Sequence, residues 1–196
     1  MIEGQDNMLL HVQDDLLAEE QRAAVDNYLH GDGWKFGWRS KGKADVYSFW
    51  HRHFAGYQKA GGDHLAYDCE AELQRFPIVY ETWRLLAGSL PEGHRLIRCY
   101  ANGIPYGSDG TVHTDTALMN TYTTVYYPHA SWSPDWGGET MFFDRARSDV
   151  ISCVYPKPNR LVIFDGRIPH VARGVSRICP VLRVTLMFKT DTPNAG

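Results

Sequence analysis

Apolar residues recur at helical intervals in two stretches of the first half of the chain. Between residues 14 and 30, apolar side chains repeat every three or four positions, and Gly31 follows as a stop signal. A second helix is predicted across residues 66–86, where Pro77 kinks or splits it because proline lacks a backbone N–H. The aromatic, glycine-rich segment between these helices is expected to contain a short helix at residues 44–54.

Near residue 93 the pattern changes from helical to strand-like, after a loop at residues 89–93. Short β-like runs are then separated by Gly, Pro, Asn and Asp, which is typical of strands joined by turns. The pattern predicts a mainly β fold, a double-sheet jelly roll or small barrel, with the N-terminal helices covering one outer face. The predicted strands are residues 95–100, 112–116, 121–127, 139–143, 150–155, 160–164, 170–175 and 182–189.

The last predicted strand indicates how the two halves meet. Its even-numbered positions from 182 to 188 are apolar and are expected to face the helices, whereas Arg183, Thr185 and Met187 face into the barrel. An arginine inside a barrel is costly unless an anion meets it. This inward arginine therefore favours a barrel that receives an anionic ligand.

Length and composition narrow the class of protein. A chain of 196 residues suits one domain, with residues 1–93 as a helical support on the substrate side and residues 94–190 as the β core. A hydrophobic content of 43% and a charged content of 22% are those of a globular protein. The net charge of −3 provides no basic field for phosphates, which argues against general nucleic-acid binding.

Cysteine spacing and hydropathy exclude further classes. The four cysteines form no C-x-x-C pair, so zinc-ribbon and thioredoxin-like sites are not expected. No window approaches the roughly 18 apolar residues of a membrane-spanning helix, and the start of the chain lacks the pattern of a signal peptide. We therefore expect no membrane partner and a cytoplasmic location.

The stretch GTVHTDT, residues 110–116, contains the first candidate chemistry. In a strand His113 and Asp115 lie on one face, about 6.5 to 7 Å apart along the chain, so both side chains can converge on one ion. His170, where the seventh predicted strand begins, offers a third ligand. Two imidazoles and one carboxylate on one face of an octahedron form the facial triad of non-haem Fe(II) oxygenases, which leaves positions open for a cosubstrate and dioxygen.

Further motifs accompany these residues in order: RLIRCYANGIPYGSDGTVHTD, TTVYYPHASWSPDWGGETMFF, RLVIFDGRIPH and RVTLMF. Over residues 95–190 the chain resembles the Fe(II)- and 2-oxoglutarate-dependent dioxygenases, most closely their prolyl-hydroxylase branch. That branch shows R-x-x-x-Y-x-x-G before H-x-D, then a tyrosine pair, G-G-E-T-x-F, a distal histidine and an R-x-S/T-L strand. The resemblance implies a double-stranded β-helix core and does not extend into residues 1–90.

The resemblance implies that His113, Asp115 and His170 form the catalytic centre and bind Fe(II), with 2-oxoglutarate and O2 as cosubstrates. It implies hydroxylation of a C–H bond with release of succinate and CO2. Hydroxylation is favoured over halogenation, because halogenases of this group carry a small residue at the position of Asp115. The short chain favours a small metabolite as substrate, and a peptidyl side chain remains an alternative; the oligomeric state is not indicated.

The resemblance also implies a site for the cosubstrate. Arg183 is expected to pair with the distal carboxylate of 2-oxoglutarate, because guanidinium presents a planar fork that matches a carboxylate. Tyr126, the first of the tyrosine pair, matches a tyrosine that donates to the same carboxylate, and Tyr100 matches one that lines the pocket. Since Arg183 lies further from the distal histidine than in the nearest relatives, Arg177 and Arg173 are rivals for its role.

Two alternative functions, a cupin-type metalloenzyme and a binding module, account for these residues less well. A cupin-type metalloenzyme without 2-oxoglutarate predicts no inward arginine, and a non-catalytic jelly-roll binding module leaves the triad unexplained. His51 and His53 lie in the predicted short helix, where positions i and i+2 do not face each other, so they are not expected to bind metal. The tryptophans are expected at the seam between helices and barrel, with the substrate pocket as an alternative for Trp38 or Trp50.

Overall fold

The computed structural model describes residues 8–40, 45–57 and 68–192. Within these ranges the chain is mainly β, and no helix is long and apolar enough to span a bilayer. In chain order the elements are β1 (Leu10–Gln13), α1 (Glu19–Leu29), β2 (Lys35–Trp38), β3 (Phe49–Gly56), α2 (Cys69–Leu73), α3 (Pro77–Ala87), β4 (Arg95–Ile104), β5 (Thr121–Tyr127), a 3-10 turn (Pro134–Trp136), β6 (Thr140–Phe143), β7 (Val150–Val154), β8 (Arg160–Asp165), β9 (His170–Ala172) and β10 (Arg183–Asp191).

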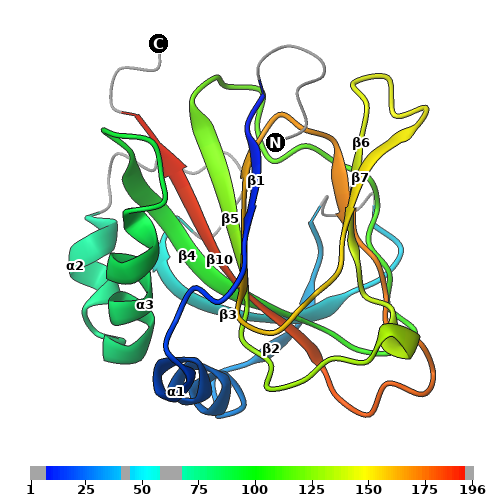
Figure 1. Ribbon diagram of the computed structural model, residues 1–196, viewed down its shortest axis with the longest axis horizontal. Coiled ribbons are helices and arrows are strands. Elements are labelled where there is room, and N and C mark those ends of the chain that lie inside the picture. The colour runs from blue at the N-terminus through cyan, green and yellow to red at the C-terminus, as the bar shows by residue number, and fades with distance from the viewer. Residues whose placement is uncertain (1–7, 41–44, 58–67, 193–196) are drawn as a thin grey trace.

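The strands form two antiparallel sheets. The larger has seven strands in the order β1-β8-β5-β10-β4-β3-β2, and the smaller has three in the order β7-β6-β9. Figure 1 shows the α-helices at the left and bottom and the β6–β7 pair at the right, with the large sheet between them. One face of the large sheet is therefore covered by helices, and its other face lies toward the small sheet.

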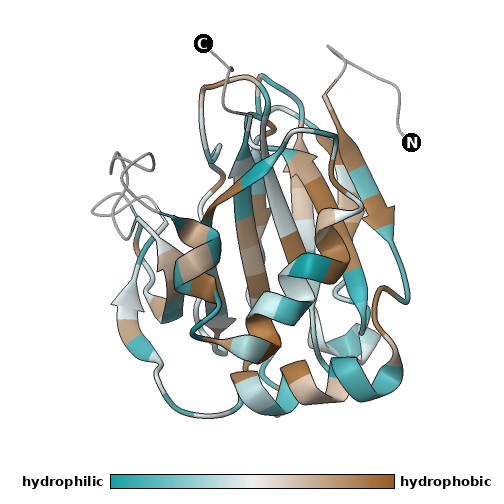
Figure 2. Ribbon diagram, turned by 90° about the vertical axis from the view of Figure 1, so that its left-hand side faces the viewer, coloured by the Kyte–Doolittle hydropathy of each residue, from teal (hydrophilic) through white to brown (hydrophobic). Residues whose placement is uncertain are grey.

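The helix-covered face is apolar, as the alternation in the last strand predicts. Val184, Leu186 and Phe188 of β10 belong to one buried cluster with side chains of α1 and α3. The rings of Trp83 and Phe188 stack with centroids 5.6 Å apart. Figure 2 shows apolar residues both on the helices and on the strands behind them.

The structure confirms the predicted split of the helix at residues 66–86 and corrects the start of the helix predicted at residues 14–30. The segment 66–86 is split as expected, because Pro77 occupies the first turn of α3, where its missing N–H costs nothing. The first helix begins at Glu19 rather than at residue 14. Residues 10–13 instead form β1 and pair with β8, so a strand precedes this helix.

The prediction of a short helix at residues 44–54 is wrong for the part that the structure describes. β3 covers most of this segment and pairs antiparallel with β4. Its aromatic side chains suit a pleated surface, and pairing with a neighbouring strand outweighs the weak helical pattern of a short window. The first half of the chain therefore extends the large sheet as well as covering it.

Asn159, in the turn before β8, fastens the segment that leads into α1. Its side-chain oxygen accepts hydrogen bonds from the Leu17 amide at 3.0 Å and the Tyr126 hydroxyl at 2.9 Å, and its amide donates to the Leu17 carbonyl at 2.7 Å. The Asn159 backbone is left-handed, with φ of 60°. One side chain thus satisfies three buried polar groups.

Replacing this side chain should destabilise the fold. Asn159→Ala leaves buried polar groups unpaired and loses a residue that tolerates left-handed backbone, so the free energy of unfolding should fall by about 3 kcal/mol in urea titrations. Asn120→Ala is the control, since Asn120 is exposed and also left-handed, with φ of 53°. Equal losses in the two variants would show that the hydrogen bonds of Asn159 contribute nothing.

Candidate functional site

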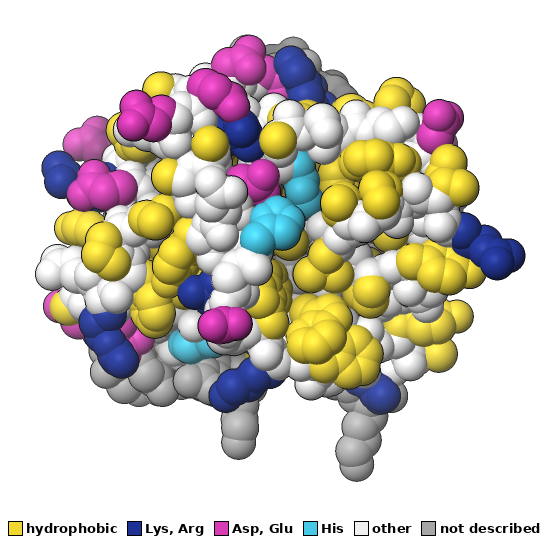
Figure 3. Space-filling view, turned by 90° about the horizontal axis from the view of Figure 1, so that it is seen from below, with side chains coloured by type: hydrophobic (Ala, Val, Ile, Leu, Met, Phe, Trp, Pro, Cys, Tyr) yellow, Lys and Arg dark blue, Asp and Glu magenta, His cyan; other side chains and the backbone are white. Residues whose placement is uncertain are grey.

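A cavity of about 1000 Å³ lies on the inner face of the large sheet. Both sheets contribute to its wall, and so do Trp38, Phe49 and Tyr57 from the first half of the chain. The lining mixes apolar side chains with histidines and charged groups, while the outer surface seen from below shows hydrophobic side chains between scattered charged ones (Figure 3). The cavity therefore combines apolar walls with a few titratable groups.

The structure brings the three candidate metal ligands together in this cavity. Ligand atoms of His113, Asp115 and His170 all lie within 4.8 Å of one another. The two Asp115 oxygens face the two rings, with Oδ1 3.7 Å from Nε2 of His113 and Oδ2 3.6 Å from Nε2 of His170. Donors from two distant segments thus surround one point.

Backbone hydrogen bonds hold the two histidine segments against each other. His113 and His170 form an isolated antiparallel bridge, with reciprocal N–H to carbonyl distances of 3.0 and 2.8 Å. The Asp115 amide also donates to the Gly166 carbonyl at 2.8 Å. The predicted strand at residues 112–116 is therefore wrong, since one bridge replaces it, and this bridge still aligns the ligands.

The ring nitrogens are arranged as a divalent metal requires. Nδ1 of His113 lies 2.8 Å from the Thr111 carbonyl, and Nδ1 of His170 lies 2.9 Å from the Ile168 carbonyl. Because a carbonyl only accepts hydrogen bonds, each Nδ1 carries the proton, and each Nε2 turns a lone pair toward Asp115. Burial lowers the pKa of His170 to about 4, against the opposing effect of Asp115, so the ring is neutral near pH 7. The donor set therefore fits Fe(II).

Asp115 is held ionised by its neighbours. Burial alone raises the pKa of this carboxyl, but the Lys189 ammonium, followed by the electrostatic effects of His170 and His113, outweighs burial and holds the pKa well below its usual range. The Lys189 ammonium contacts Oδ2 of Asp115, and the Thr123 hydroxyl donates to the same oxygen at 2.6 Å. Burial lowers the pKa of Lys189 less than Asp115 raises it, so the pair stays charged.

Lys189 is a site residue that the sequence analysis missed. It lies on β10 two positions beyond Met187 and lines the same cavity. The alternation that places Arg183 and Thr185 inward also assigns Lys189 to that face. The signal was present in the sequence, although nothing there indicated that the ammonium meets Asp115.

Arg183 lies at the other end of the same strand. Its side chain is 1% exposed and lines the cavity. Nε donates to the Gly138 carbonyl at 2.5 Å, and Nη2 donates to the Thr140 hydroxyl at 3.0 Å. Gly138 permits this approach, because a Cβ atom there would lie 2.9 Å from Cδ of Arg183. The guanidinium is thereby fixed before any ligand arrives.

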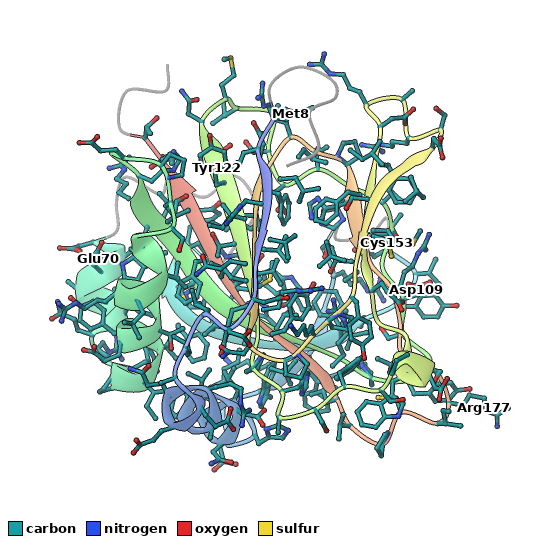
Figure 4. All side chains as sticks on the ribbon, viewed as in Figure 1. Met8, Glu70, Asp109, Tyr122, Cys153 and Arg177 are labelled. Carbon is teal, nitrogen blue, oxygen red and sulfur yellow. The ribbon has the colours of Figure 1, made fainter. Side chains whose placement is uncertain are left out.

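The rival arginines lie elsewhere. Arg177 points away from the molecule (Figure 4), with its guanidinium 6.0 Å from the ring of Tyr106. Arg173 pairs with Asp109 at 3.6 Å. Neither is among the described residues that line the cavity.

The two tyrosines of the expected cosubstrate site are placed differently. Tyr100 lines the cavity. Tyr126 belongs to the cluster that faces the helices and donates its hydroxyl to Asn159, so the structure does not bring it to Arg183. Tyr127 points the other way: its hydroxyl lies 2.7 Å from that of Thr140, and its ring lies 5.5 Å from the Arg183 guanidinium. Successive residues of a strand face opposite sides, so Tyr127 and not Tyr126 is the tyrosine that lies beside Arg183.

His51 and Trp38, from the first half of the chain, lie beside the cavity and outside the triad. His51 stacks on Trp38 at 4.1 Å between centroids, and its Nδ1 lies 3.0 Å from the Asn102 side-chain oxygen. Burial lowers the pKa of His51 to about 4. Trp38 lines the cavity, in line with the alternative given for it, whereas Trp50 is partly exposed and packs against Phe36.

The comparisons with known proteins agree with this geometry. Residues 97–188 match the profile of the 2OG-Fe(II) oxygenase superfamily. No curated protein matches the chain in sequence. The profile covers the triad, Tyr100 and Arg183 together.

Several solved structures have a similar fold. A prolyl hydroxylase from Trichoplax adhaerens, in complex with a hypoxia inducible factor peptide fragment, is 17% identical, with a TM-score of 0.59 over 93% of this chain and 83% of that one. A prolyl-4-hydroxylase from Pseudomonas putida is 16% identical, with a TM-score of 0.60 over 95% and 94%. HygX from Streptomyces hygroscopicus, with nickel and 2-oxoglutarate bound, is 10% identical, with a TM-score of 0.61 over 94% and 83%. At these identities the likeness is one of fold.

Removing the carboxylate should abolish metal binding at this site. In anaerobic Co(II) titrations followed by visible absorption, Asp115→Asn should bind more than about a hundredfold more weakly than the parent, since even outer-shell losses approach that factor. The free energy of unfolding without metal should fall by about 3 kcal/mol, because Lys189 stays buried without its carboxylate.

Asp109→Asn is the matched control, because Asp109 also lines the cavity but lies outside the triad. Its affinity for Co(II) should equal that of the parent. A comparable loss in both variants would mean that the metal is held by the general charge of the cavity rather than by the three ligands.

Proposed function

We propose that the chain, whose residues 97–188 match the 2OG-Fe(II) oxygenase superfamily profile, is a hydroxylase of that superfamily in which His113, Asp115 and His170 bind Fe(II). The bound iron, with 2-oxoglutarate and O2, supplies an oxidation that hydroxylates a C–H bond and releases succinate and CO2. The observation that carries the proposal is the set of donors: two imidazole nitrogens and one ionised carboxylate around a common point beside a large cavity.

Arg183 binds the distal carboxylate of 2-oxoglutarate in this proposal. Its guanidinium is buried, fixed by Gly138 and Thr140, and presented to the cavity. A buried cation of this kind is favourable only when an anion meets it, and the planar fork matches a carboxylate. Tyr127 takes the position beside Arg183 that was expected for Tyr126, and Tyr100 lines the pocket as expected.

The remaining residues of the centre orient the ligands. Lys189 and Thr123 hold the Asp115 carboxylate in one position, and the two backbone carbonyls hold the histidine rings. Such outer contacts fix the protonation and direction of metal ligands. The protein thus keeps three donors in place while the cavity admits cosubstrate and substrate.

The proposed architecture is a double-stranded β-helix that forms one unit with the N-terminal region. The order of β4, β10, β5 and β8 in one sheet, opposite β9, β6 and β7 in the other, supports this assignment. In this proposal the described part of residues 1–93 supports the core and lines the substrate side, because Trp38, Phe49 and Tyr57 contribute to the cavity. A cupin without 2-oxoglutarate is disfavoured by the inward Arg183, and a binding module is disfavoured by the triad.

The proposal is tested by the spectrum of the complex. Anaerobic addition of Fe(II) and 2-oxoglutarate should produce a weak visible charge-transfer band, because the keto acid chelates the ferrous ion. Asp115→Asn, which removes a ligand, is the control and should give no band. A folded parent protein that binds Fe(II) and 2-oxoglutarate without this band would contradict the proposal.

Titration of the same band tests the role of Arg183. Arg183→Met should weaken 2-oxoglutarate binding by about a hundredfold, since truncating one member of a buried charge pair costs about 2–5 kcal/mol. Arg183→Lys keeps the charge but not the fork and should be intermediate. Arg177→Met, at an exposed arginine outside the cavity, should leave the dissociation constant unchanged; the opposite pattern would transfer the role to Arg177.

A further inference from the structure

The strand pair β10–β4 carries cations at both ends of its cavity face. Arg183 begins this face, and Lys189 ends it directly opposite Arg98 of β4. All three line the cavity. The inward-facing pairs along the two strands are Arg183 with Ile104, Thr185 with Asn102, Met187 with Tyr100, and Lys189 with Arg98.

The two cationic ends are too far apart to serve one small anion. Three steps of two residues separate Arg183 from Lys189, which is about 20 Å along the strand. This span separates the backbone positions of the two residues, and in the proposed complex 2-oxoglutarate occupies the space between the Arg183 guanidinium and the metal ligands, which leaves Arg98 without a carboxylate. The triad lies next to the Lys189 end, because Lys189 contacts Asp115.

At the Lys189 end of the strand pair, one of the two cations has an anionic partner and the other has none among the described residues. Lys189 is neutralised by Asp115 and donates to the Thr123 hydroxyl at 2.9 Å. Arg98 is 8% exposed, and its Nε and Nη2 have no hydrogen-bond partner among the residues that the structure describes. Two cations placed directly opposite each other in a sheet repel, and a buried guanidinium without partners is costly. This arrangement is favourable only if a further anion enters.

Aromatic rings frame the guanidinium of Arg98, whose Nε and Nη2 are buried without a hydrogen-bond partner among the described residues. The guanidinium carbon lies 4.4 Å from the centroid of Tyr100, 5.2 Å from Trp38 and 5.3 Å from Tyr57. Rings at these distances hold the flat cation in one orientation. Nε and Nη2 are the two adjacent N–H groups of one guanidinium edge, the edge that binds a carboxylate through two parallel hydrogen bonds.

We propose that Arg98 binds a carboxylate of the substrate, so that the substrate is a small carboxylic acid held next to the metal centre on the side away from Arg183. This proposal rests on the proposed hydroxylase function and names the substrate class for the same site. A carboxylate fits better than a phosphate, because the excess charge at this end is that of one guanidinium. Arg98 is then a binding residue that fixes which C–H bond faces the triad.

Acetate is the probe, with neutral acetamide and inorganic phosphate as comparisons at equal ionic strength. With Fe(II) and saturating 2-oxoglutarate under anaerobic conditions, acetate should raise the thermal unfolding midpoint of the parent more than acetamide or phosphate does. Arg98→Met should bind acetate about tenfold more weakly or worse, because it loses charge-assisted hydrogen bonds. Its midpoint without acetate should not fall, since an uncompensated buried charge is removed.

Arg52→Met is the matched control. Arg52 also packs over rings, 4.4 Å from the Tyr28 centroid and 5.2 Å from that of Phe54, but it is not among the described residues that line the cavity. It should keep the acetate response. Arg98→Lys should fold and respond weakly, because the ammonium keeps the charge without the fork.

Three results would overturn the proposal. They are an equal acetate response in Arg98→Met and parent, a stronger response to phosphate than to acetate, and a large loss of stability or of 2-oxoglutarate binding in Arg98→Met but not in Arg52→Met. The acetate series is repeated without Fe(II) and 2-oxoglutarate. A protein that lacks the charge-transfer band but keeps an Arg98-dependent acetate response would refute the hydroxylase function and retain the anion site.

Discussion

The two-sided character of β10 is the constraint on which the site depends. One face of this strand packs against the helices through Val184, Leu186 and Phe188, and the other carries Arg183 and Lys189 into the cavity. Burying two cations on the inner side of a central strand is tolerable only when carboxylates meet them. Asp115 meets Lys189 in the folded chain, and a ligand carboxylate is left to meet Arg183. The apolar face supplies the packing that keeps both cations in place.

The sequence predicted this strand and the triad well, because both depend on local regularities. Alternation with a period of two distinguishes the apolar face from the charged one, and the motifs around His113 and His170 are specific in type and order. The pattern around residues 44–54 was too short to separate helix from strand, since pairing with β4 decides it. Motif matching also failed to identify which tyrosine of the pair lies beside Arg183, because a shift of one residue in a strand moves a side chain to the other face. The uncompensated charge of Arg98 depends on partners distant in sequence and became visible only in the assembled sheet.

The two proposed anion-binding arginines lie at opposite ends of the β10–β4 strand pair. Arg183 lies at one end with a hydrogen-bonded, fixed guanidinium, whereas Arg98 lies at the other, framed by rings, with one buried edge that has no hydrogen-bond partner among the described residues. Lys189 lies directly opposite Arg98 and contacts Asp115, which is one of the three proposed metal ligands. An enzyme arranged in this way distinguishes two acidic ligands by position rather than by chemistry. The first half of the chain contributes to the substrate end through Trp38 and Tyr57.

The reciprocal backbone bonds between His113 and His170 have a consequence for how the centre is assembled. These bonds join segments that lie far apart in the chain, and they use backbone N–H and carbonyl groups alone, so the metal-binding ring nitrogens take no part in them. The conformational entropy of bringing the imidazoles together is therefore lost when the polypeptide folds, not when the cation is captured. Ion capture can then be reversible while the scaffold persists, in contrast to small zinc domains whose folding requires the metal.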